Sequence, residues 1–215
     1  MPFDFLRRRK DEAAAPRPQS AASSSQGGSA FDGLTEEWRL VGRMHIDGRL
    51  SDALNARPTA IDLSDVRWAP IDGSADFTPA PGIKSIDPYD LIVVLAGDES
   101  LPPMSDEERV AHKVHKISYD VALELPPFRV IGTVHLYPGS EPERLLDRAK
   151  EMFIPVTEAV ALLGEQQISD PEIDAVLINR FYLRGITQVD KRTREKVQPL
   201  PGRPLGGVSW QDRSR

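Results

Sequence analysis

Two nine-residue stretches of this chain read almost alike, and this internal repeat constrains the fold more than any other feature. Residues 38–46 read WRLVGRMHI and residues 128–136 read FRVIGTVHL. Arginine, glycine and histidine recur in register, and apart from Arg43 against Thr133 the other positions exchange one apolar residue for another. Further matches follow in the same order: Gly48 with Gly139, Leu54 with Leu145, 61–66 with 154–159, and Asp87-Pro88 with Asp170-Pro171. This shared order predicts an internal duplication.

Each repeated stretch has the period of a β-strand with one apolar face. The residues of that face are Trp38, Leu40, Gly42, Met44 and Ile46 in the first stretch, and Phe128, Val130, Gly132, Val134 and Leu136 in the second. His45 and His135 fall on the opposite face. Because glycine inside a strand marks a bulge or a close approach of another element, both strands are expected to be irregular at this point.

The pattern that follows each repeated strand is a short helix and two more strands. In the first copy we expect a helix over 51–56, ended by Pro58, and strands over 60–68 and 90–96; in the second, a helix over 141–151 and strands over 153–163 and 174–187. Residues 69–85, which contain three prolines, are expected to form an exposed connection. The alternating run 117–125 predicts an extra strand that pairs antiparallel with 128–136. Before it, Ser105 and Glu108 form a capping box that predicts a helix over 106–113.

We therefore predict an α+β fold that is mainly β, with two tandem β-α-β-β units. Each unit is expected to form a small curved sheet or partial barrel, and the two are expected to pack about a pseudo-twofold axis. The expected division of the chain is a disordered tail over 1–33, the first repeat over 34–100, a capped helix and linker over 101–116, the second repeat with its leading strand over 117–189, and a disordered basic tail over 190–215.

Charge and cysteine content narrow the classes of function. The chain has 215 residues and a net charge of -6, but residues 34–189 alone hold 26 acidic and 15 basic residues. A core this acidic repels phosphate backbones, which argues against nucleic-acid binding by the folded part. The chain has no cysteine, which excludes disulfides and thiolate metal sites and fits the cytoplasm, our expected location. No apolar run is long enough for a membrane helix.

Histidines are the candidate metal ligands. His45 and His135 could converge between the two halves as a metal or acid-base pair, or they could be structural positions copied by duplication; no third ligand recurs with them. His112 and His115 could share one helix face, but the glutamate of a zinc-protease motif is missing and Lys113 lies between them. The favoured interpretation is a structural position for His45 and His135 and a solvated helix end for His112 and His115, and no metal or other cofactor is predicted.

The two termini carry short segments that resemble docking peptides. One combines Phe3, Phe5 and Leu6 with the basic run Arg7, Arg8, Arg9 and Lys10, and the other contains Trp210. Apolar side chains beside charge can dock into a partner's groove, and the first segment could also contact an anionic membrane weakly. The alternative for the first segment is a merely solubilising start.

Several longer strings resemble uncharacterised bacterial proteins that carry a small β-rich domain. They are GRLSDALN with IDLSDV, and PPFRVIGTVHLYPG with FIPVTEA and INRFYLRGI, within residues 36–189. The resemblance implies a bacterial origin and assigns no activity to any residue.

The function predicted from these features is a non-catalytic scaffold or adaptor that binds a protein partner or a second copy of itself and recruits partners through its tails. One alternative is a small-molecule or metal-dependent enzyme with its site between the halves near His45 and His135. A second alternative is a nucleic-acid binder of the small-barrel kind, which needs a basic surface.

Overall fold

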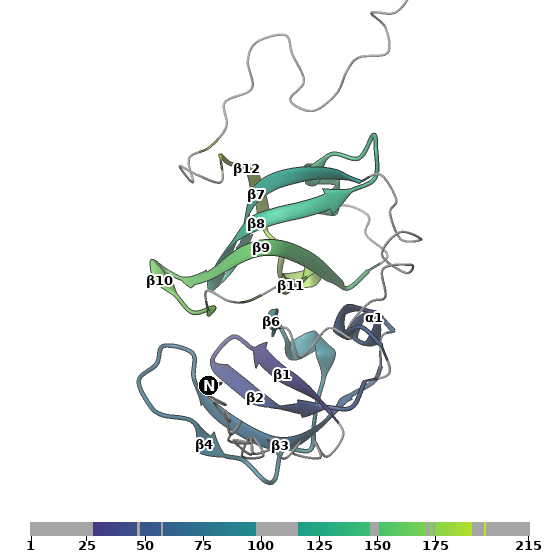
Figure 1. The fold of residues 1–215 in the computed structure, drawn as a ribbon. Helices are drawn as coiled ribbons and strands as arrows, with labels where there is room; N and C mark the ends of the chain where they lie inside the picture. Colours follow the sequence, from purple (N-terminus) through teal and green to yellow (C-terminus); the bar gives the residue numbers. More distant parts are fainter. Residues whose placement is uncertain are drawn as a thin grey trace, which may run out of the picture.

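A computed structural model describes residues 28–46, 48–56, 58–97, 116–146, 151–170, 173, 175–190 and 196. Within these residues, twelve strands form one antiparallel sheet in the order β12-β7-β8-β9-β11-β6-β1-β2-β3-β4, with β5 paired to β3 and β10 paired to β9 (Figure 1). The mainly β class predicted from the sequence is confirmed, and α1 is the one α-helix of the described part.

The strands form two lobes (Figure 1). The first lobe contains β1 (Ser29–Leu34), β2 (Trp38–Met44), α1 (Leu50–Asn55), β3 (Ile61–Pro70), β4 (Thr78–Pro79), β5 (Ser85–Ile86), the 3-10 turn η1 (Pro88–Asp90) and β6 (Val93–Ala96). The second contains β7 (Ile117–Leu125), β8 (Phe128–Leu136), the 3-10 turn η3 (Pro142–Leu145), β9 (Phe153–Leu163), β10 (Gln166–Gln167), β11 (Ala175–Asn179), the 3-10 turn η4 (Arg180–Tyr182) and β12 (Gly185–Gln188).

The predicted hairpin of the second lobe is confirmed residue for residue. β7 and β8 pair antiparallel from Ile117 opposite Leu136 to Leu125 opposite Phe128. β9 also has the predicted bounds, and α1 begins and ends one residue before the predicted helix. These elements have strong local patterns, either strict alternation or a helix stopped by a nearby proline, so their bounds could be predicted without knowledge of their partners.

The first lobe begins earlier than predicted. Residues 29–33 were assigned to a disordered tail, but β1 spans Ser29–Leu34 and pairs with β2 along its whole length. β1 therefore holds the position in the first lobe that β7 holds in the second, and the leading strand is not an addition of the second lobe. The sequence pattern missed β1 because its stability as a strand comes from pairing with β2 and β6, not from an alternating pattern of its own.

Other predicted elements are shorter or broken. Of the helix predicted over 141–151, the structure describes residues 141–146 and 151, and the first of these stretches forms the 3-10 turn η3 rather than an α-helix. The predicted strand over 174–187 is divided into β11 and β12 by η4. Similarly, η1 occupies the start of the predicted strand over 90–96, and β3 and β4 extend into the predicted connection over 69–85. The predicted helix over 106–113 lies outside the described residues.

The turns η1 and η4 also correct one match in the repeat. The Asp87 carboxylate accepts a hydrogen bond from the backbone N of Tyr89, and the Asn179 side chain accepts one from the backbone N of Phe181. The strand after each turn pairs with the leading strand of its own lobe, β6 with β1 and β12 with β7. The counterpart of Asp87 is therefore Asn179 and not Asp170.

Both glycine-bearing strands have the irregularity that the sequence predicts. The pairing of β2 with β3 shifts register at Gly42, and the pairing of β8 with β9 shifts at Gly132. A Cβ atom at either glycine would lie 2.8 Å from atoms of the neighbouring strand. Opposite the glycines, Asp65 and Glu158 adopt the left-handed backbone conformation, with φ of 52° and 48°. Each lobe thus has a bulge that turns its long strand.

The two lobes share their central strands. β6 pairs with β11, and every residue of both strands is buried. Alternate side chains enter different cores: Val93, Leu95, Val176 and Ile178 pack with the core that consists mainly of the second lobe, and Val94, Ala96, Ala175 and Leu177 pack with the core that consists mainly of the first. Both strands therefore read as continuous apolar runs, because both of their faces are covered.

Polar side chains also tie the lobes together. The Asn55 side chain of α1 donates to the backbone O of Phe153 at 2.9 Å and accepts from its backbone N at 2.7 Å. Arg39 forms a bidentate ion pair with Asp32 and donates to the backbone O of Ile168 at 3.1 Å. The lobes are therefore parts of one folded body.

Candidate binding surfaces

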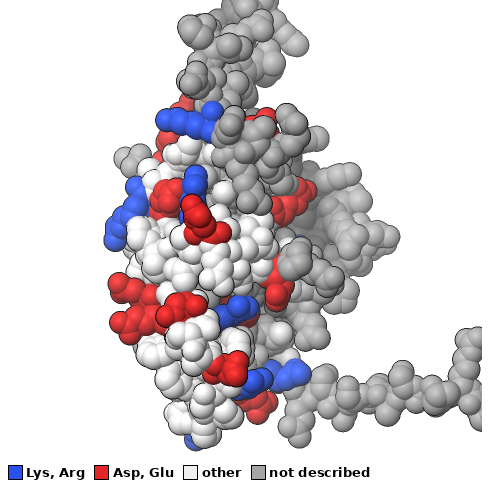
Figure 2. Space-filling model, turned by 90° about the vertical axis from the view of Figure 1, so that its left-hand side faces the viewer, with Lys and Arg blue, Asp and Glu red and all other residues white. Residues whose placement is uncertain are grey.

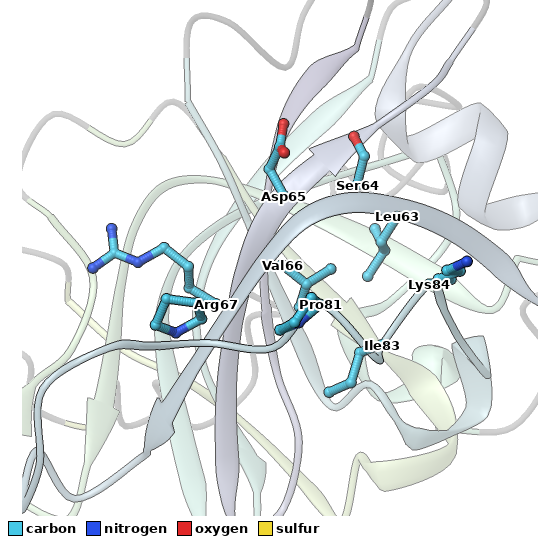
Figure 3. A pocket seen from close by; sticks show the side chains of 9 residues that line it. Leu63, Ser64, Asp65, Val66, Arg67, Pro81, Ile83 and Lys84 are labelled. Carbon is cyan, nitrogen blue, oxygen red and sulfur yellow. The ribbon is translucent and has the colours of Figure 1, made fainter.

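A groove lies along the outer part of β3 in the first lobe (Figure 3). Its volume is about 640 Å³. The residues that line it come from β3 and from the segment that follows β4: Leu63, Ser64, Asp65, Val66 and Arg67, with Pro79, Pro81, Ile83 and Lys84. The groove has apolar walls, and Ile83 in its wall is 37% exposed.

The groove exists because β3 loses its regular partner beside the bulge. β4 pairs with β3 at Arg67 and Trp68, and β5 resumes pairing only at Ile61 and Asp62. Between these pairs the neighbouring segment reads APGIK over residues 80–84, and Pro81 has no N–H to donate to a ladder. The segment therefore bows away from β3, held by one hydrogen bond at each end, Ala80 N to Val66 O and Leu63 N to Lys84 O.

Two cations flank the groove. Figure 3 shows the Arg67 and Lys84 side chains on its two sides, with Ser64 and Asp65 directed toward another side of β3. The Arg67 guanidinium lies 5.7 Å from the centre of the Phe77 ring and donates to the Phe77 backbone O at 3.4 Å, so Phe77 positions it. A ligand in the groove would meet apolar walls and two positive charges, with Ser64 and the Asp65 carboxylate at one edge.

The equivalent place in the second lobe is paired more fully. β11 pairs with β9 over five consecutive residues, from Ala175 opposite Thr157 to Asn179 opposite Phe153, so this ladder reaches the second bulge at Glu158. Its sequence AVLIN contains no proline or glycine, whereas β5 pairs with β3 only at Ile61 and Asp62, before the first bulge. The open groove is thus a difference between the lobes, and it could be suspected from sequence only as a proline-rich segment in one repeat.

A second exposed surface lies where the two lobes meet, at the turns η1 and η4. The Tyr89 and Phe181 rings are 50% and 47% exposed, and their centres lie 5.5 Å apart. The Tyr182 hydroxyl donates to the backbone O of Tyr89 at 3.0 Å, which links the two turns. The Arg180 guanidinium lies 5.3 Å from the centre of the Phe181 ring.

Acidic residues lie beside the turn η1. Asp87 caps this turn and Asp90 is its last residue, so both stand next to Tyr89 in the chain fold. Burial raises the pKa of Tyr182, and the negative charges of Asp90, Glu36 and Asp87 raise it further. We call Tyr89, Phe181, Tyr182 and these three carboxylates the junction surface. Sequence patterns could not reveal it, because its aromatic residues lie about ninety positions apart in the chain.

The wider surface is acidic. The described residues include nineteen aspartates and glutamates against eleven lysines and arginines. Figure 2 shows acidic side chains gathered in groups on one face of the molecule.

The structure separates the two repeated histidines. His45 follows β2, His135 lies in β8, and four strands stand between β2 and β8 in the sheet, so about 24 Å of sheet separates them at the usual strand spacing. Both are exposed, as the alternation predicts. The His135 ring bonds the hydroxyls of Ser118 at 3.0 Å and Thr157 at 2.9 Å, one on each neighbouring strand.

The remaining candidate residues lie outside the described part of the chain: His112, His115, the terminal residues 3–10 and Trp210. Within the described part, no group of three or more His, Cys, Asp or Glu side chains could hold a metal ion. Nor is any helix in that part long and apolar enough to cross a membrane. No family model, curated protein or solved structure matches the chain.

Proposed function

We propose that this protein is a non-catalytic binding module, an adaptor that holds an extended apolar segment of a partner protein in the groove beside β3. The observation that carries the proposal is the difference between the lobes. Beside the bulge, β11 pairs with β9 as far as Thr157, whereas β5 pairs with β3 only at Ile61 and Asp62 and leaves the groove next to Leu63 and Ser64.

The shape of the groove favours a chain segment over a small molecule. The groove is lined by two adjacent stretches of chain, 63–67 and 79–84. A molecule bound between them would keep its outer side exposed to solvent. Sites for small molecules usually bury most of the ligand surface. An extended segment gains enough contact by lying along the strand and inserting alternate side chains into the groove.

The charges indicate the composition of that segment. Arg67 and Lys84 flank walls formed by side chains such as Val66 and Ile83. Acidic residues beside apolar ones would complement this arrangement. The sequence that leads into β11 and forms it has this composition, since residues 173–179 read IDAVLIN.

We also propose that the two lobes arose by duplication of one unit in a bacterial cytoplasmic protein. Support for duplication comes from the paired bulges at Gly42 and Gly132 and from the paired caps Asp87 and Asn179. The cysteine-free composition supports a reducing compartment.

A peptide library displayed on phage, panned against the purified full chain, tests the groove. We expect enriched peptides to combine apolar and acidic residues, as the IDAVLIN peptide does. Their affinity should fall at least about tenfold with Ile83→Glu, which places a carboxylate in the apolar wall, and should fall less with Arg67→Glu.

The matched control is Leu146→Glu, because Leu146 is 42% exposed and follows η3 in the other lobe. Peptides that bind the Ile83→Glu and Leu146→Glu variants equally well, or panning that enriches no peptide, would overturn the proposal.

A further inference from the structure

The junction surface has the chemistry of a site for cationic side chains. Two half-exposed aromatic rings lie side by side. Asp87 and Asp90 belong to the same turn as Tyr89, and Glu36 lies near enough to act on the neighbouring Tyr182. Aromatic faces and carboxylates both attract guanidinium and ammonium groups. Arg180 already shows the contact within the molecule, since its guanidinium lies over the Phe181 ring.

The ligand should also carry apolar side chains. The Tyr89 and Phe181 rings are about half exposed, and covering apolar surface stabilises a complex. A ligand that carries both apolar side chains and positive charges would satisfy the whole surface.

We propose that the occupant is the chain's own N-terminal segment, residues 3–10. This segment reads FDFLRRRK, so it supplies two phenylalanines, one leucine, and four positive charges against the one negative charge of Asp4. The segment therefore matches the aromatic rings with apolar side chains and the carboxylates with positive charge. This site is separate from the groove beside β3.

The tether is long enough. Seventeen residues, 11–27, separate the segment from Gly28, where the described part of the first lobe begins, and they can span at most about 60 Å. Glu36 lies just beyond the far end of β1, a six-residue strand, so about 20 to 25 Å separates it from Gly28. The segment can therefore reach the junction surface of the same molecule.

When residues 3–10 are docked on the junction surface, an outside partner of either one must first displace this contact. An anionic surface would have to displace the tail from the carboxylates before it could bind residues 7–10. The tail would in turn shield the aromatic rings from self-association.

Paramagnetic NMR on the full chain tests the proposal. Because the chain has no cysteine, an Asp4→Cys variant takes a single nitroxide label. We expect loss of the amide signals of Tyr89, Asp90 and Phe181, at a level independent of protein concentration. The signals should return when Glu36→Lys and Asp90→Lys are combined, and should stay lost with Asp76→Lys and Glu165→Lys, two exposed acidic residues in loops.

Three results would overturn the inference. The first is retention of the junction signals in the labelled chain, and the second is their loss in the Glu36→Lys/Asp90→Lys variant as well. The third is loss that appears only when nitroxide-labelled and isotope-labelled chains are mixed, because the tail would then dock on a second copy. None of these results bears on the groove, whose peptide test uses Ile83→Glu.

Discussion

The two lobes pair their strands alike but differ in how the long strand is covered. β9 pairs with β11 over five residues, up to Thr157 beside its bulge, and with β10 at Leu162 and Leu163. β3 pairs with β5 and with β4 at only two residues each, and residues 80–84 bow out between them. The bulges, the leading hairpins and the capped turns are common to both. What the lobes share therefore builds the fold, and what differs leaves a groove in one of them.

The two lobes are not separable units. β6 and β11 each contribute side chains to both cores. The largest effect is therefore expected at this central pair. Val94→Asp places a carboxylate at a fully buried position opposite Leu177 and should cost at least about 4 kcal/mol.

Both lobes should lose structure in that variant. Tryptophan fluorescence reports the first lobe through Trp38 and Trp68, and amide hydrogen exchange of β7 and β8 reports the second. Val160→Asp, at a half-buried position of β9, is the control and should cost about 1 kcal/mol. A Val94→Asp protein whose second lobe keeps full protection would mean that the lobes fold independently.

The same central pair shows where prediction from sequence stops. The β7–β8 hairpin was predictable because its alternation and its prolines lie within twenty residues. The runs LIVVLA and AVLI read as buried strands, but nothing local says that each is the other's partner, eighty residues away. A shared Asp-Pro pair even suggested a false match, which only the hydrogen bonds of Asp87 and Asn179 corrected.

Neither the groove nor the junction surface could be predicted from local sequence patterns. The APGIK segment reads as an exposed connection, and only its failure to pair with β3 turns it into a groove wall. Tyr89 and Phe181 are unremarkable as single residues, and the fold of both lobes is needed to bring their rings together.

The two caps should differ in energy although they make the same local bond. Asn179 is fully buried, and its side-chain amide also donates to the backbone O of Leu91 at 2.7 Å, whereas Asp87 is exposed. Asn179→Ala leaves buried polar backbone groups without partners and should cost about 2 to 4 kcal/mol. Asp87→Ala should cost about 1 kcal/mol, as the loss of an ordinary cap does.

Urea denaturation of the two variants measures the difference directly. Equal losses would mean that the bonds of Asn179 to the first lobe add nothing to its role as a cap. The Asn179 amide also donates to the backbone O of Pro88 at 3.4 Å. Because a substitution at Pro88 keeps this backbone oxygen, only a change at Asn179 removes the bond.

The repeated arginines form the last contrast. Arg39 is about three-quarters buried with Asp32 and also bonds Ile168, whereas the pair of Arg129 with Glu124 is nearly half exposed. Arg39→Ala should cost about 1 to 2 kcal/mol and Arg129→Ala less than about 0.5 kcal/mol, measured by thermal and urea denaturation. Similar costs would mean that the bond of Arg39 to the second lobe does not stabilise the junction.

The pH dependence of stability shows which force dominates at the buried pair. Burial raises the pKa of Asp32, and the hydrogen bond and charge of Arg39 lower it by less. A carboxyl whose pKa is raised on folding contributes most to stability below its unfolded pKa and loses that contribution as pH rises through the folded pKa. The stability of the native chain minus that of Asp32→Asn should therefore fall as pH rises from below the ordinary pKa of an aspartate through the raised pKa of Asp32. A difference that instead grows with pH would mean that attraction to Arg39 outweighs burial, and the pair would then stabilise the fold as an ion pair.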